Sequence, residues 1–226
     1  MSKLLSFHND PSIKEKYLNR LHLHYKADEI IKGTYWQNGK GCAVGCTVHS
    51  SSHASYESEL GIPRILARLE DTIFEGLPNE EAKEFPIRFL EAIPVGVDLD
   101  PVWRKFMIWL LVDENEGVIR HAKTAKTKKA IRDVAQTFSD SLTKTVSHEK
   151  WATVRRAAAA AGHPAGGTAA YAAYAAAYAG VLLGAAGGSF AVAAMSGALL
   201  LSRCRAARSR KYVVISEKLI ELLKGA

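Results

Sequence analysis

The sequence has few cysteines, no secretory signal and no strand-like alternation of polar and apolar residues. Three cysteines among 226 residues exclude a disulfide scaffold. Residues 1–11 lack the pattern of a secretory leader, which predicts a reducing, cytoplasmic setting. Charged residues make up 23% and hydrophobic residues 48% of the chain, and these values exclude general disorder and collagen-like structure.

Apolar residues recur at helical spacing, and they follow typical helix-start residues such as Asp10-Pro11 and Asp100-Pro101. This pattern predicts an all-α protein, a multi-helix bundle. Residues 34–53 hold glycines and serines instead, which predicts a loop feeding a short helix. The expected helices cover residues 11–31, 63–77, 79–93, 100–112 and 117–146.

One long stretch has no charge. Ala157–Ser202 contains no Asp, Glu, Lys or Arg in 46 residues, and 20 of them are alanine. Glycine pairs divide it, so we expect a C-terminal Ala-rich helical hairpin, followed by an amphipathic helix over Val214–Leu223. We expect the hairpin to be buried against protein, although Val181–Leu201 is long enough to span a bilayer. The predicted domains are residues 1–146 and 147–226.

Charge is unevenly distributed. Residues 1–116 carry 13 Lys/Arg and 18 Asp/Glu, a net charge of −5, whereas residues 117–226 carry 17 and 5, a net charge of +12. A basic half can contact phosphates, an anionic membrane surface or the acidic half of the same chain. The densest basic run is the candidate for phosphate or nucleic-acid contact: Arg203, Arg205, Arg208, Arg210 and Lys211.

Two cysteines and two histidines form the cluster most capable of chemistry: Cys42, Cys46, His49 and His53. Their spacing places them on one stripe of a helix, and thiols and imidazoles are ligands that zinc prefers. We therefore treat the four as a candidate zinc site. A straight helix would separate the first from the last by roughly 16 Å, so one ion requires a bend or ligands from elsewhere. The histidines available for this on the first expected helix are His22 and His24.

Other interpretations of this segment stay open. Cys42 or Cys46 is a candidate nucleophile, because a glycine-rich turn before a helix places a thiol near backbone N–H groups that favour the thiolate. The run from Trp36 to Cys42 partly resembles papain-like peptidases, where a glutamine upstream of the cysteine helps form the oxyanion hole. The glycines around Lys40 suit a phosphate cradle. Alternatively, both cysteines are small buried hydrophobic residues.

A wider resemblance covers roughly residues 12–112. The run Gly39-Lys40-Gly41-Cys42-Ala43-Val44-Gly45-Cys46, with Gly61-Ile62-Pro63, Ala67–Asp71, Phe74–Pro78 and the ending Lys218–Leu222, resembles a loose group of uncharacterised bacterial and phage-encoded helical proteins. Such a resemblance implies a soluble helical array with an Ala-rich tail. It implies no activity, because none is known for the group.

Taken together, these patterns favour a non-enzymatic helical protein that binds a partner or assembles with itself. The first alternative is a metal-binding or cysteine-dependent enzyme centred on Cys42, Cys46, His49 and His53. The second is a nucleic-acid-binding protein that uses the basic C-terminal half. We expect no cofactor other than zinc.

Overall fold

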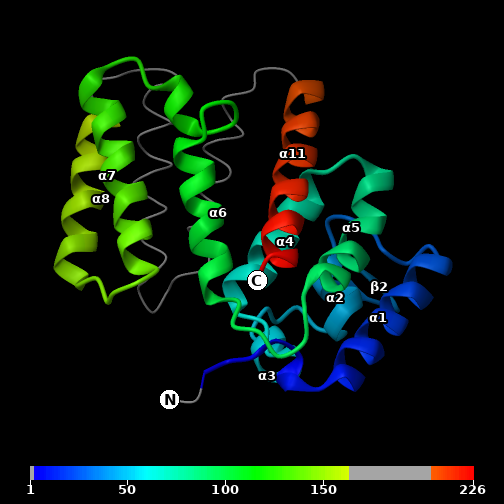
Figure 1. Ribbon diagram of the computed structural model, residues 1–226. Helices are drawn as coiled ribbons and strands as arrows, with labels where there is room; N and C mark the ends of the chain where they lie inside the picture. The colour runs from blue at the N-terminus through cyan, green and yellow to red at the C-terminus, as the bar shows by residue number, and fades with distance from the viewer. Residues whose placement is uncertain (1–2, 163–204) are drawn as a thin grey trace. The chain divides into compact units, whose positions relative to one another are not determined.

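The computed structural model describes residues 3–162 and 205–226, and within these ranges the protein is an all-α, multi-helix fold (Figure 1). This confirms the predicted fold class. Of the predicted Ala-rich stretch, residues 157–162 form the end of a helix, and residues 163–202 lie outside the described residues. The elements are η1 (Ser6–Asn9), α1 (Pro11–Lys26), β1 (Trp36–Gln37), β2 (Lys40–Gly41), α2 (Ala43–Val48), α3 (Ser55–Leu60), α4 (Arg64–Gly76), α5 (Asn79–Ala92), α6 (Asp100–Val112), η2 (Val118–His121), α7 (Ala125–Ser141), α8 (His148–Gly162) and α11 (Arg205–Lys224).

The helix starts follow the expected chemistry. The side chain of Asp10 accepts a hydrogen bond from the backbone N–H of Ser12 at 2.8 Å, and proline occupies the first position of α1. Thr124 caps α7 in the same way, through the N–H of Thr127. The predicted helices at α4, α5 and α6 are confirmed. The predicted helix over 11–31 is too long, because α1 ends at Lys26.

The chain forms two compact units. The first comprises Met1–Val102 and Ala206–Ala226, and the second comprises Trp103–Arg205. The boundary that the sequence predicted, at residue 146, falls inside the second unit between α7 and α8. The C-terminal helix α11 belongs to the first unit, so that unit is built from two distant segments of sequence.

The core of the first unit surrounds α2, which packs against α1, α4 and α5. All six residues of α2 are buried. Helices α1, α4 and α5 bring large side chains to this core, and each contributes about 1.5–3 kcal/mol when fully buried. The largest of these buried side chains include Tyr17, Leu21, Leu66, Phe74, Phe85 and Phe89.

Helix α11 packs on α4 through close contact at a glycine. A Cβ atom added to Gly76 would lie 2.1 Å from the ring of Tyr212, so no larger residue fits at that position without movement. Along α11, Ile215, Leu219 and Leu223 are fully buried at intervals of four residues, the spacing of one helical face. This confirms the amphipathic helix expected over Val214–Leu223, although α11 is longer.

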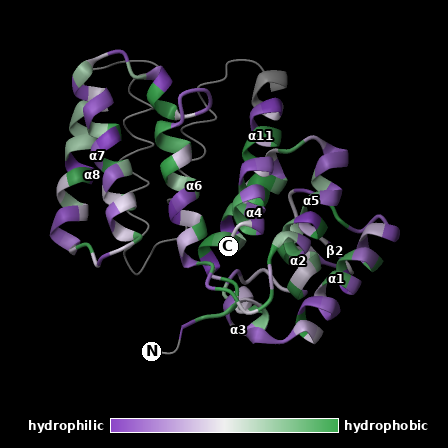
Figure 2. Ribbon diagram, viewed as in Figure 1, coloured by the Kyte–Doolittle hydropathy of each residue, from purple (hydrophilic) through white to green (hydrophobic). Residues whose placement is uncertain are grey.

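The second unit is held by aromatic packing between helices. Phe138 on α7 meets Trp151 on α8, with ring centres 4.8 Å apart, and Trp103 on α6 at 5.8 Å. Figure 2 shows that α6 is mostly apolar, whereas α7 and α8 mix hydrophilic and hydrophobic residues. Among the described helices, none has the length and apolarity needed to cross a membrane. The alternative membrane span, Val181–Leu201, lies outside these residues.

Candidate functional site

A small hairpin precedes the Cys/His segment. Trp36–Gln37 pairs antiparallel with Lys40–Gly41, and the two residues between them, Asn38 and Gly39, have φ of 51° and 82°. Both angles are positive, as in the tight turns that connect two-residue hairpins. The dipeptide Asn-Gly is the strongest sequence signal for such a turn, and sequence reasoning missed it.

Two glycines let this hairpin lie directly against α2. A Cβ atom at Gly41 would be 2.1 Å from the carbonyl oxygen of Tyr35, and one at Gly45 would be 1.5 Å from the same atom. Neither position accepts a side chain, since real Cβ atoms do not approach backbone so closely. The glycines therefore serve close backbone packing, which favours a structural role over a phosphate cradle.

Both cysteines of the segment are buried, and their thiols are free. Burial, above all, raises the pKa of Cys42 far beyond its ordinary range, and the nearby carboxylate of Asp71 adds to the effect. Burial also raises the pKa of Cys46 to about 12, and its Sγ lies 3.3 Å from the carbonyl oxygen of Gly41. A nucleophilic cysteine needs an accessible thiolate, and this arrangement favours the protonated thiol at both positions.

His49 joins a chain of polar side chains with α1. Its Nε2 lies 2.8 Å from Nε2 of His24, and Nδ1 of His24 lies 2.6 Å from Oε2 of Glu29. The His49 ring also stacks on Trp36, with centres 4.3 Å apart and planes 12° from parallel. Burial lowers the pKa of His49, and the positive charge of Arg20 lowers it further. This group places His49 beside His24.

His53 contacts a different partner. Its Nε2 lies 3.3 Å from Oδ2 of Asp71, and its ring meets the edge of Tyr35 at 5.7 Å. Helix α2 ends at Val48, and His49 takes a left-handed conformation with φ of 52°. The chain therefore turns between the two histidines, and the single helical stripe that the spacing predicted does not form.

Around Asp71, three side chains hold buried polar atoms that have no hydrogen-bond partner among the described residues: Oδ1 of Asp71, the hydroxyl oxygen of Tyr56 and both carboxylate oxygens of Glu70. Burial raises the pKa of Glu70 well above its ordinary range, the Tyr56 hydroxyl opposes this, and the Asp71 charge adds to it. Sequence reasoning missed Glu70. The available signal was its place four residues after Leu66 and three before Ile73, on the apolar stripe of α4.

The four predicted ligands thus divide into separate groups. His49 contacts His24, His53 contacts Asp71, and the thiol of Cys46 faces backbone carbonyl oxygens. In residues 3–162 and 205–226, no three or more His, Cys, Asp or Glu side chains are grouped to hold a metal ion. A zinc site built from Cys42, Cys46, His49 and His53 therefore stays a prediction.

The structure describes only part of the predicted basic site. Arg203 lies outside the described residues, as do the side chains of Arg205 and Arg208. Arg210 is exposed and Lys211 is half-buried, both on α11. A nucleic-acid face built on the basic run stays a prediction.

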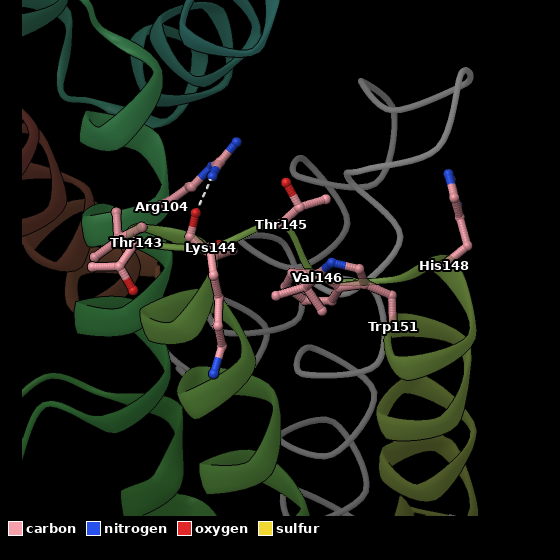
Figure 3. Close-up of a pocket in the computed structure, with 9 residues that line it drawn as sticks. Arg104, Thr143, Lys144, Thr145, Val146, His148 and Trp151 are labelled. Atoms are coloured by element: carbon pink, nitrogen blue, oxygen red, sulfur yellow. Dashed lines mark hydrogen bonds between the residues drawn. The ribbon is translucent and has the colours of Figure 1, made fainter.

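A hollow of about 420 Å³ lies in the second unit, where α7 connects to α8. Arg104 donates a hydrogen bond to the carbonyl oxygen of Ser141 at 2.5 Å, and Nζ of Lys144 lies 3.4 Å from Oδ2 of Asp140. Figure 3 shows the Lys144 ammonium group and the His148 ring pointing in different directions, so the basic groups do not converge on one point. The lining residues are Arg104, Ser141, Leu142, Thr143, Lys144, Thr145, Val146, His148 and Trp151.

A second hollow, of about 320 Å³, lies in the first unit, and we call it the apolar groove. Its apolar lining comes from Ile30, Ile31, Phe74 and Ala82. Lys83, at this groove, pairs with Asp28 at 2.6 Å, and this hydrogen bond is the main cause that raises the pKa of Lys83. The charged lining residues are Asp28, Lys32, Glu80 and Lys83.

Comparison with protein-family models, with curated proteins and with solved structures gave no match. The resemblance to the loose group of bacterial and phage-encoded proteins therefore stays a prediction. The proposals below rest on the geometry of this chain.

Proposed function

We propose that this chain is a non-enzymatic binding protein, and that it associates with a second copy of itself through the apolar groove. One observation carries the proposal. Of the five large apolar side chains that are exposed in the described residues, four lie between residues 23 and 35, and one of these, Ile31, lines the groove. Clustered exposed apolar groups mark protein contact sites on folded proteins.

The charges around the groove favour a second copy over a strongly charged partner. The lining includes two carboxylates, Asp28 and Glu80, and two ammonium groups, Lys32 and Lys83. In a two-fold contact, the same surface meets itself, so a rim with equal numbers of both signs can place each charge opposite its complement. Ile31, which is 36% exposed, would be covered in such a contact.

The thiol chemistry supports a binding role more than a catalytic one. Burial raises the pKa of both Cys42 and Cys46, so the described conformation disfavours a thiolate nucleophile. Two free thiols in the described residues suit a cytoplasmic setting, which we also propose.

Sedimentation velocity over a hundredfold range of protein concentration tests the self-association. We expect wild type to shift from monomer to dimer as concentration rises, and Ile31→Glu to remain monomeric because a carboxylate cannot be buried in the contact. Val214→Glu is the matched control. Val214 is an aliphatic residue on α11, 38% exposed, that does not line the groove, so this variant should dimerise like wild type.

Two results would contradict the proposal. One is a wild-type protein that stays monomeric at the highest concentration. The other is an Ile31→Glu variant that dimerises as well as wild type. Circular dichroism of each variant, compared with wild type, shows whether the helical fold is retained.

A further inference from the structure

The pair His24 and His49 is the most specific arrangement of metal-binding atoms in the first unit. Their Nε2 atoms face each other at 2.8 Å, and the ring centres are 5.0 Å apart. Helix α1 supplies His24, which is buried, and the end of α2 supplies His49, which is exposed. Residues 25 positions apart in sequence thus bring two imidazole nitrogens to one point at the protein surface.

Glu29 determines which nitrogen of His24 is available. Nδ1 of His24 lies 2.6 Å from Oε2 of Glu29, so this nitrogen carries the proton and donates it to the carboxylate. Nε2 of a neutral His24 then holds a lone pair that points toward His49. A carboxylate on the far nitrogen of a histidine is the usual outer support of a metal-binding imidazole, because it fixes the tautomer and raises the basicity of the ligand nitrogen.

We propose that His24 and His49 bind a divalent transition-metal ion through their Nε2 atoms, with Glu29 as the outer-shell support and water in the remaining positions. Imidazole nitrogen suits zinc, copper and nickel. The site differs from the one predicted from spacing, because it uses His49 but takes its second ligand from α1. It has two protein ligands, which agrees with the finding that the described residues contain no group of three.

Metal binding requires a reorientation of the His49 ring and no net loss of a proton. In the metal-free pair, Nε2–H of His49 donates to the lone pair of His24. When the metal binds, His49 carries its proton on Nδ1 instead, so both Nε2 lone pairs face the ion. Two nitrogens at about 2.0–2.1 Å from a tetrahedral ion lie about 3.3 Å apart, so the pair must open by about 0.5 Å and the His49 ring must turn until both lone pairs point at the ion.

The surroundings of His49 allow this opening. His49 is exposed, and its ring lies nearly parallel to Trp36, at 12° and 4.3 Å between centres. A ring can slide within its own plane over a stacked neighbour without losing the contact. The same stack provides a readout, because a paramagnetic ion bound to His49 lies close enough to quench the fluorescence of Trp36.

Nickel titration of the tag-free full chain, followed by tryptophan fluorescence and equilibrium dialysis, tests the site. We expect one Ni²⁺ per wild-type chain, with quenching, and competition by Zn²⁺. His49→Ala removes one ligand at an exposed position and should lose at least tenfold in affinity, and Glu29→Gln should lose about 10–100-fold.

Controls separate binding from its readout. His22→Ala removes an exposed histidine two residues before His24 and should bind like wild type. Trp36→Phe should keep the bound nickel in dialysis and lose part of the quenching. Two results overturn the proposal. One is a His49→Ala variant that binds Ni²⁺ as tightly as wild type. The other is a wild-type protein that is folded, as His22→Ala is, and binds no nickel.

Discussion

Glu70→Gln tests the energetic cost of a carboxyl group buried in the core of the first unit. Glu70 is fully buried, and neither of its oxygens has a hydrogen-bond partner in the part of the chain that the structure describes. Burial raises its pKa in the folded protein, whereas in the unfolded chain it titrates near the ordinary value of about 4.3. As pH rises above that ordinary value, the unfolded chain releases the proton while the folded protein keeps it.

The sign and size of the effect follow from this difference. A group whose folded pKa is raised makes the unfolded state relatively more favourable as pH rises, so wild type loses about 1.4 kcal/mol of stability per pH unit from this group. The loss begins near the ordinary carboxyl value and stops at the raised pKa. Glutamine does not titrate, so Glu70→Gln should lack this contribution. Its amide adds a constant cost of about 1–3 kcal/mol if its N–H groups remain unpaired.

Urea unfolding of both proteins at about pH 5 and about pH 6 measures the effect. The free energy of unfolding of Glu70→Gln minus that of wild type should rise between these two values, by up to about 1.4 kcal/mol, whatever the constant offset. Glu84→Gln, at an exposed position of α5, is the control and should show no such rise. The reasoning is refuted if the free energies of unfolding of Glu70→Gln and wild type differ by the same amount at both pH values.

Three further predictions concern packing, thiols and α11. Gly45→Ala places a Cβ atom 1.5 Å from a backbone oxygen and should lower the free energy of unfolding by about 1–3 kcal/mol or more, measured by urea denaturation. Iodoacetamide should label Cys42 and Cys46 at least tenfold more slowly in folded than in urea-unfolded protein, as peptide mass spectrometry would show, because burial raises the pKa of both thiols. Arg88→Ala removes the 2.8 Å ion pair with Glu217 and should cost about 0.2–1 kcal/mol, less in high salt, in the same unfolding assay.

Much of the helical fold was predictable because its signals are local. A cap residue, a proline at the first position and an apolar stripe act within one or two helical turns, and they placed α4, α5 and α6 correctly. Helix α1 ended earlier than predicted. After Lys26 the chain turns through Asp28, whose φ of 53° no helix accommodates, and the apolar spacing in the sequence continues past that turn.

The candidate site was less predictable because it depends on contacts between distant residues. Spacing alone placed His49 and His53 on one stripe, but the left-handed residue at the end of α2 separates them. His24 was identified as an available ligand, yet its approach to His49 depends on the packing of α1 against α2. The role of Glu70 depends on which face of α4 is buried, and the apolar stripe already indicated that face.

The place of α11 in the first unit has a consequence for synthesis of the protein on the ribosome. Residues 3–102 emerge first, but the surface of α4 at Gly76 is completed only by Tyr212, well over a hundred residues later. Domains usually fold as units in the order of their synthesis. Residues 3–102 therefore stay incomplete, with one apolar side uncovered, until α11 has been synthesised. During that interval, chaperones that recognise exposed apolar surface have a binding site that the mature protein no longer offers.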